Sequence, residues 1–144
     1  MKTQWICTVS AVCIMAISGM VFGDEQIKVS PADSVIVLPA SPTPSQKEAA
    51  DELIKHLKLI TGTDIATAQQ GNLPQKDYVF YVGIKPADDN APFKAEEARW
   101  SVTPKATYLY GDDGKNQRGS QFAVYDFLEN QLGVRWTEPG DKGI

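Results

Sequence analysis

Residues 118–136 read RGSQFAVYDFLENQLGVRW, and this stretch decides much of the fold. Apolar side chains recur in it at the spacing of one helix face: Val124, Phe127, Leu128 and Leu132. Gly133 follows directly, and a glycine at this position is typical of a left-handed helix end. The stretch therefore predicts a helix over roughly 120–132, and Val134-Arg135-Trp136 predicts a short final strand.

Two strands that form a hairpin are predicted just before this helix. Residues 100–102 and 106–110 flank a Pro-Lys pair that is typical of a turn. Alternation along the second strand places Tyr108 and Tyr110 on one face, with Leu109 on the other. Further upstream, residues 78–82 read YVFYV and are apolar on both faces, which indicates a central strand of the sheet.

The first strand and the first helix are predicted nearer the start of the chain. Residues 34–38 read SVIVL, a nearly continuous apolar run with β-branched residues. A proline-rich connection follows, and Ser45 stands three residues before Glu48, the spacing of a capping box. The helix is expected to end at Gly62, and residues 63–76 are expected to be an irregular connection.

These elements together predict an α+β fold. Their order is strand, helix, strand, hairpin, helix and strand, with short connections between them. Such an order is expected to give two layers, in which two main helices cover one face of a mixed β-sheet. No internal repeat and no low-complexity segment interrupts this pattern.

The first 23 residues are expected to be a signal peptide. A lysine near the start, an uncharged run from Trp5 to Gly23 and small residues at its end are typical of one. Cleavage near Gly23 would export the protein to the periplasm or the exterior and leave residues 24–144 as one domain. Two alternatives stay open: the 19-residue run could remain as a membrane span, or Cys13 could carry a lipid.

The composition of residues 24–144 excludes several classes of function. Loss of Lys2 leaves 13 of the 14 basic residues against 18 acidic ones, so the net charge becomes −5. This balance and the lack of a basic cluster argue against nucleic-acid binding. Both cysteines lie in the predicted signal peptide, so no disulfide or thiol nucleophile is expected. His56 is the single histidine, which rules out a two-histidine zinc site. No cofactor and no metal is predicted.

Three acidic pairs are candidates for catalytic carboxylates: Asp88-Asp89, Glu96-Glu97 and Asp112-Asp113. Glycoside hydrolysis needs two carboxylates that face one bond, one of them with a raised pKa. Adjacent acidic residues on a loop usually diverge into solvent. The pairs are therefore predicted to be solvated, and no catalytic residue is assigned.

Possible glycan contacts are Tyr108, Tyr110 and Arg118. The two tyrosines are candidates for an exposed platform on which a sugar ring stacks, although strand aromatics more often fill a core or its rim. The loop 111–119 leads into a helix N-terminus, where Arg118 could help to hold a sugar carboxylate. A plain strand-to-helix connection is the alternative. His56 is expected at the surface or at the edge of the core.

The stretch at 118–136 also carries a resemblance to a known family. It resembles the end of the non-catalytic N-terminal domain of α-glucuronidases and β-hexosaminidases, and most closely that of large secreted bacterial proteins with an α-glucuronidase-type N-terminal domain. The family pattern is a Gly-Asp turn, a glycine, a helix of the form G-V-Y-x-F-L-E and then L-G-x-R-W. Here Gly111-Asp112 supplies the turn, and Ala123 stands where the family usually has glycine. The likeness spans most of residues 34–140.

The resemblance implies a two-layer α+β domain that precedes and buttresses a catalytic (β/α) barrel. In that family the acid/base carboxylates belong to the barrel, which takes roughly 250 residues. The expected function is thus an exported, non-catalytic accessory domain of a carbohydrate-degrading glycoside hydrolase. Its partner would be the barrel, in the same chain or in a partner glycosidase. The alternatives are a stand-alone glycan-binding module, with polysaccharide as the partner, and a small hydrolase with an unrecognised site.

Overall fold

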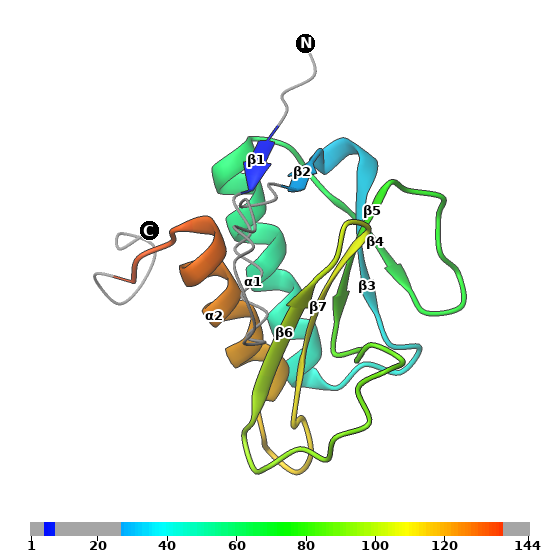
Figure 1. The fold of residues 1–144 in the computed structure, drawn as a ribbon, viewed down its shortest axis with the longest axis vertical. Helices are drawn as coiled ribbons and strands as arrows, with labels where there is room; N and C mark the ends of the chain where they lie inside the picture. Colours follow the sequence, from blue (N-terminus) through cyan, green and yellow to red (C-terminus); the bar gives the residue numbers. More distant parts are fainter. Residues whose placement is uncertain (1–4, 8–26, 137–144) are drawn as a thin grey trace, which may run out of the picture.

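The computed structural model of the protein describes residues 5–7 and 27–136 (Figure 1). The main sheet has five strands in the order β4-β3-β5-β7-β6. These strands are β3 (Ser34–Leu38), β4 (Ala66–Gln69), β5 (Tyr78–Val82), β6 (Ala98–Val102) and β7 (Ala106–Gly111). The first four positions of this order are parallel, and β6 pairs antiparallel with β7 as the predicted hairpin.

Two helices cover one face of this sheet (Figure 1). Helix α1 (Pro44–Thr61) follows β3, helix α2 (Gly119–Leu132) follows β7, and the two helices pack against each other. Within β5, Tyr78, Phe80 and Val82 belong to the core between the layers. The predicted two-layer α+β fold, a mixed sheet with two main helices, is confirmed, and so is the central position of β5.

A second, smaller sheet joins β1 (Trp5–Cys7) to β2 (Ile27–Val29) in antiparallel pairing. Strand β1 belongs to the predicted signal peptide, whereas the predicted cleavage position near Gly23 and the lipid candidate Cys13 lie outside the described residues. A short 3-10 helix (Pro31–Asp33) then leads into β3. Within the described ranges, no helix is long and apolar enough to cross a membrane.

Three local predictions were wrong. Helix α1 begins at Pro44, with Thr43 and Gln46 forming the capping box that had been expected at Ser45 and Glu48. The connection 63–76, predicted to be irregular, contains the strand β4, which pairs with β3 through its backbone. Its side chains are small and polar, so the sequence shows no strand pattern there. No strand forms after α2, because the N–H of Val134 donates to the carbonyl of Leu128 at 3.1 Å and closes the helix end.

No helix of the described residues covers the other face of the sheet. Parallel strands joined by a crossover are connected right-handedly, so the loop 70–77 between β4 and β5 is expected to cross β3 on the side away from α1. Figure 1 shows this loop on that side of the sheet. Val35 and Val37 point to the same side in register with Val79 and Tyr81 of β5, and both valines are fully buried. This loop covers one part of the face, and the loop 84–97, which contacts Tyr110 and Arg99, covers another part.

Candidate functional site

Helices α1 and α2 begin at the same edge of the sheet, where the parallel strands β3, β5 and β7 end. Two hollows lie at this carboxyl edge, with volumes of about 350 and 380 Å³, and Thr43 and Asp113 line both. Arg118 lines the first hollow and Tyr110 lines the second. Two of the three residues predicted to contact a glycan therefore reach neighbouring hollows at one edge.

Asp113 connects the starts of the two helices. Its carboxylate accepts hydrogen bonds from the backbone N–H of Ser120 at 2.9 Å, from the Ser120 hydroxyl and from the side-chain amide of Gln46 at 2.9 Å. A carboxylate is favourable at a helix N-terminus because free N–H groups and the helix dipole attract negative charge. The prediction that Asp113 is a solvated loop residue is therefore wrong.

A close contact between two glycines sets the position of α2 against β7. A side chain at Gly119 would meet the carbonyl carbon of Gly111 at 2.6 Å, and one at Gly111 would meet the backbone of Gly119 at 2.6 Å. Only residues without Cβ atoms allow this approach. The loop 111–119 is thus a strand-to-helix connection in which the glycines are required by space.

Arg118 precedes α2 and is exposed. It shares its hollow with polar side chains from both helix starts and the connecting loop, namely Ser45, Glu48, Asn116 and Gln117. The Ser120 N–H at this helix start, however, already donates to Asp113. A sugar carboxylate at this point would have to compete with the carboxylate of the protein itself.

Tyr110, near the end of β7, is buried beneath the loop 84–97. It is therefore not the exposed platform that the sequence suggested. Its hydroxyl donates to Asp89 at 2.6 Å, and Arg99 donates to the same carboxylate at 3.1 Å. Arg99 also donates to Glu97 at 3.0 Å, and its guanidinium lies 4.8 Å from the ring centre of Phe93. These contacts hold the loop 84–97 against the sheet, and Asp89 is not the solvated residue that was predicted.

The same contacts shift the ionisation of this network. The hydrogen bond from Tyr110, together with Arg99, holds the pKa of Asp89 below its usual value. The hydrogen bond from Arg99 likewise lowers the pKa of Glu97, while Glu97 and Asp89 raise the pKa of Arg99. Burial and the bond to Asp89 raise the pKa of Tyr110. At neutral pH, Asp89 and Glu97 are therefore ionised, Arg99 is protonated and Tyr110 is neutral. These are the charge states that the hydrogen bonds of the network require.

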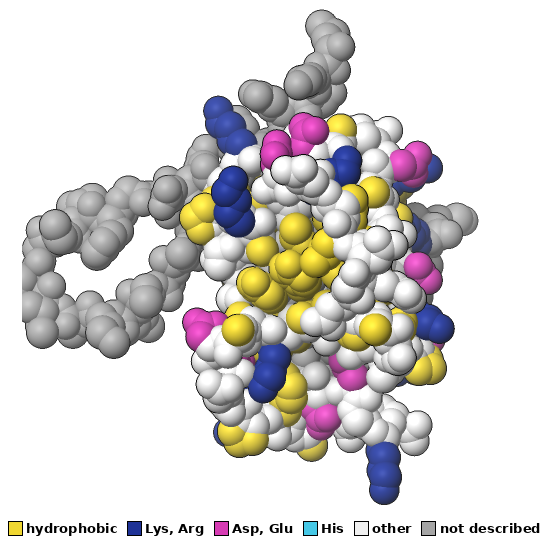
Figure 2. All heavy atoms as spheres, turned by 90° about the vertical axis from the view of Figure 1, so that its right-hand side faces the viewer, with side chains coloured by type: hydrophobic (Ala, Val, Ile, Leu, Met, Phe, Trp, Pro, Cys, Tyr) yellow, Lys and Arg dark blue, Asp and Glu magenta, His cyan; other side chains and the backbone are white. Residues whose placement is uncertain are grey.

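Tyr108 lies on the helix-free face of the sheet, as does Tyr81 on the neighbouring strand β5. Their rings are stacked, with centroids 4.8 Å apart and planes 13° from parallel, and both side chains are half-buried. Figure 2 shows an apolar area in the middle of this face, surrounded by polar and charged atoms. We call the group formed by Tyr81, Tyr108, the Ser101 that pairs with Tyr108, and Asp88 of the loop 84–97 the open patch.

His56 is fully buried, which corrects its predicted position at the surface or the core edge. Its Nδ1 lies 2.8 Å from the carbonyl oxygen of Glu52, and its ring packs edge-on against Trp136 with centroids 5.0 Å apart. The ring of Tyr125 also packs edge-on against Trp136, with ring centroids 5.2 Å apart. The histidine is thus part of the packing between α1 and the residues after α2, away from both hollows and from the open patch.

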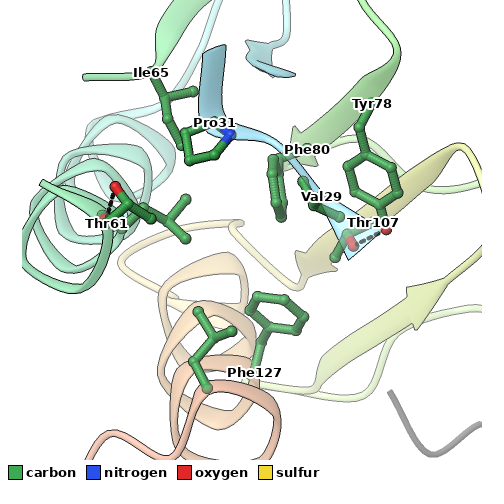
Figure 3. Close-up of a pocket in the computed structure, with 10 residues that line it drawn as sticks. Val29, Pro31, Thr61, Ile65, Tyr78, Phe80, Thr107 and Phe127 are labelled. Atoms are coloured by element: carbon green, nitrogen blue, oxygen red, sulfur yellow. Dashed lines mark hydrogen bonds between the residues drawn. The ribbon is translucent and has the colours of Figure 1, made fainter. Parts of the chain in front are cut away.

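A third cavity lies inside the fold, between α1, α2 and the sheet (Figure 3). Its lining is almost wholly apolar and includes Val29, Ile65, Phe80 and Phe127. Its volume of about 30 Å³ is close to the space that one water molecule takes in the liquid. This cavity is a packing defect of the core and is too small to hold a sugar.

Tyr81, Asp88 and Ser101 are the members of the open patch that the sequence analysis did not name as possible ligand contacts. Side chains along a strand point alternately to its two faces, so the predicted strand 78–82 places Tyr81 on the face opposite that of Phe80. Pairing of Tyr81 with Tyr108 depends on which strands are neighbours, and no pattern within either strand carries that information. The position of Asp88 depends on the path of the loop 84–97.

The described residues contain no group of three or more histidine, cysteine or acidic side chains arranged to hold a metal ion. Asp113 at the carboxyl edge and Asp89 in its network use their charges within the protein, whereas Asp88 of the open patch makes no hydrogen bond or ion pair with the described residues. A scan of the chain against protein-family models and a search of curated proteins each found no match.

Proposed function

We propose that the protein is an exported, non-catalytic accessory domain of a carbohydrate-degrading glycoside hydrolase. In this role it buttresses a catalytic (β/α) barrel, which belongs either to the same chain or to a partner glycosidase. The proposal rests on the resemblance of residues 118–136 to the N-terminal domain of α-glucuronidases and β-hexosaminidases. Catalytic residues are not carried over, because in that family they belong to the barrel.

One observation carries the proposal: the residues of the resembling segment build the scaffold. Gly119 allows the contact with β7, Phe127 and Leu128 are buried in the core, and Gly133 ends α2 in a left-handed conformation. Trp136 packs against the buried His56. A motif whose members position two layers is what a supporting domain needs, whereas a catalytic motif would present polar groups to a substrate.

The acidic pairs agree with a supporting role. Each pair contributes at least one carboxylate to hydrogen bonds within the protein: Asp89 binds Tyr110 and Arg99, Glu97 binds Arg99, and Asp113 joins α1 to α2. Their ionised forms are used to hold loops. A general acid of a glycosidase instead needs a raised pKa, which the lowered pKa values of Asp89 and Glu97 oppose.

The helix layer offers a surface for the partner. Three of the most exposed large apolar side chains belong to α1, to α2 and to the residues after α2: Leu59, Phe122 and Trp136. Apolar side chains left in water favour contact with another protein surface.

Two measurements test the proposal. The purified protein should not hydrolyse aryl-glycosides, and hydrolysis that a substitution within this chain abolishes would contradict the accessory role. Sedimentation should show self-association that rises with concentration and that the double substitution L59S/F122S reduces. A wild-type protein that stays monomeric at high concentration counts against an exposed partner surface on the helix layer.

A blot of the native product with an antibody to residues 24–144 then identifies the partner. A band several times heavier than the mature domain places the barrel in the same chain. A band at the mass of the domain itself directs the search to a separate glycosidase.

A further inference from the structure

The five tyrosines differ in how they use their hydroxyl groups. Tyr78 contacts Thr107 at 2.8 Å, Tyr110 donates to Asp89, and Tyr125 accepts from Gln121 at 3.1 Å. The hydroxyls of Tyr81 and Tyr108 make no hydrogen bond to any residue in the described part of the chain. The two tyrosines that are stacked on the helix-free face are therefore the two whose hydroxyls stay available.

The strand next to Tyr108 leaves room beside its ring. Register pairs Tyr108 with Ser101 of β6, the edge strand, so a small polar side chain follows the two aromatic rings across the sheet. Tyr81 stacks on one face of the Tyr108 ring, and the neighbour of Tyr108 on the other side, in β6, is the small Ser101. An aromatic ring face and three hydroxyl groups are thus presented side by side.

Asp88 adds an unused carboxylate to this arrangement. It is exposed and directly precedes Asp89, whose carboxylate accepts from Tyr110, two residues from Tyr108 on the same face of β7. In contrast to Asp89, it makes no hydrogen bond or ion pair with the described residues. Arg99 of β6 already binds Asp89 and Glu97. Asp88 is the member of the open patch that carries a formal charge, and this charge is negative.

These groups match the chemistry of one ligand class. A pyranose ring has an apolar C–H face that packs on an aromatic ring, and hydroxyl groups around its rim that donate to a carboxylate and to phenolic oxygens. We propose that the open patch, made of Tyr81, Tyr108, Ser101 and Asp88, binds an uncharged pyranose unit of a polysaccharide. The sugar ring stacks on the outer face of Tyr108, and its hydroxyls bind Asp88 and the tyrosine hydroxyls.

The site selects against acidic sugars. A uronic acid would bring its carboxylate toward that of Asp88, and like charges at short range repel each other. The site therefore differs from the one suggested for Arg118, which would favour an acidic sugar. It also lies on the face opposite the helix layer, so it does not depend on the accessory role proposed above.

Calorimetry with defined oligosaccharides tests the site on the purified protein. The probes are xylohexaose, chitohexaose and a xylohexaose that carries a glucuronic acid branch. We expect an uncharged probe to bind and the acidic one to bind more weakly. Y108A should weaken binding about tenfold or more through loss of the stacking surface. D88N should reduce the discrimination against the acidic probe.

Control variants separate the site from general effects on the fold. Y125F removes a tyrosine hydroxyl on the helix layer and should leave the affinity unchanged. Binding should also perturb the tyrosine absorption spectrum, and Y81F should reduce this change while its circular dichroism stays that of the wild type. The proposal is overturned if neither uncharged probe binds, if Y108A binds as tightly as Y125F, or if the acidic probe is preferred.

Discussion

At the scale of single residues, Asp89 shows how a loop carboxylate becomes part of the structure. It follows Asp88 directly, and the two residues differ in their bonding. Asp89 accepts hydrogen bonds from Tyr110 and Arg99, whereas Asp88 stays exposed. Nothing in the dipeptide distinguishes them, because the distinction comes from which side chain the loop 84–97 turns toward the sheet.

The lowered pKa of Asp89 makes the stability of the protein depend on pH. An ordinary aspartate titrates near pH 3.9, so the unfolded chain binds a proton at a higher pH than the folded protein does. The network therefore stabilises the fold above that pH, and this contribution is lost as the pH falls through the depressed pKa. Y110F removes the largest cause of the shift. We expect a shallower loss of thermal stability on acidification from pH 5 to pH 2 in Y110F.

The matched control for this prediction is Y125F, which deletes a tyrosine hydroxyl that no carboxylate contacts. Thermal unfolding over the same pH series should show the wild-type slope for Y125F. Identical slopes in Y110F and the wild type would mean that the Tyr110 hydroxyl does not control the ionisation of Asp89.

At the scale of elements, the start of α1 shows that a sequence pattern alone does not fix where a helix begins. Both Thr43–Gln46 and Ser45–Glu48 have the spacing of a capping box, and the structure uses the first. Pro44 explains the choice, because proline is favoured in the first turn of a helix, where its missing N–H costs nothing. Ser45 then lies within the helix and contacts Asp113 only at 3.5 Å.

This assignment predicts different costs for two similar substitutions. T43A should lower the free energy of unfolding by about 1 kcal/mol, because the N–H of Gln46 loses its acceptor. S45A should change it by less than about 0.5 kcal/mol. Urea unfolding of both variants measures the difference. A larger loss in S45A than in T43A would show that the helix is capped at Ser45 after all.

At the scale of the whole molecule, the packing of α2 against the sheet holds the two layers together. Phe127 is almost fully buried and meets Phe80 and Trp100 edge-on, with ring centroids at 6.4 and 6.0 Å. It also lines the small cavity between the layers (Figure 3). Phe122 lies on the same helix, but this residue is 42% exposed.

The two phenylalanines give a matched test of this packing. F127A should cost about 3–5 kcal/mol of unfolding free energy, since it removes a large buried ring and enlarges an existing cavity. F122A should stay within about 0.5 kcal/mol of the wild type. Urea unfolding with a common slope for all three proteins measures both values. Similar losses in the two variants would contradict the burial of Phe127 between the layers.

The sequence by itself determined the two helices, the central strand, the hairpin and therefore the α+β class. Each of these signals is local: the apolar stripe ending at Gly133, the run of residues 78–82, and the Pro-Lys turn before Tyr108. Burial of one face imposes a period of 2.0 or 3.6 residues on a strand or helix, so the pattern survives without knowledge of the neighbours. The same logic fails for β4, whose edge position demands little burial.

Only the tertiary structure decided which side chains meet. It buried His56 and Tyr110, placed Arg118 in a hollow apart from Tyr108, and stacked Tyr108 on Tyr81. It also left Asp88 free while Asp89 was bound. These outcomes depend on strand order and on the paths of the loops 70–77 and 84–97, which bring together residues far apart in the chain. Contacts of this kind produce no periodic pattern in the sequence, because a contact between two distant residues does not fix which residue types stand next to either of them.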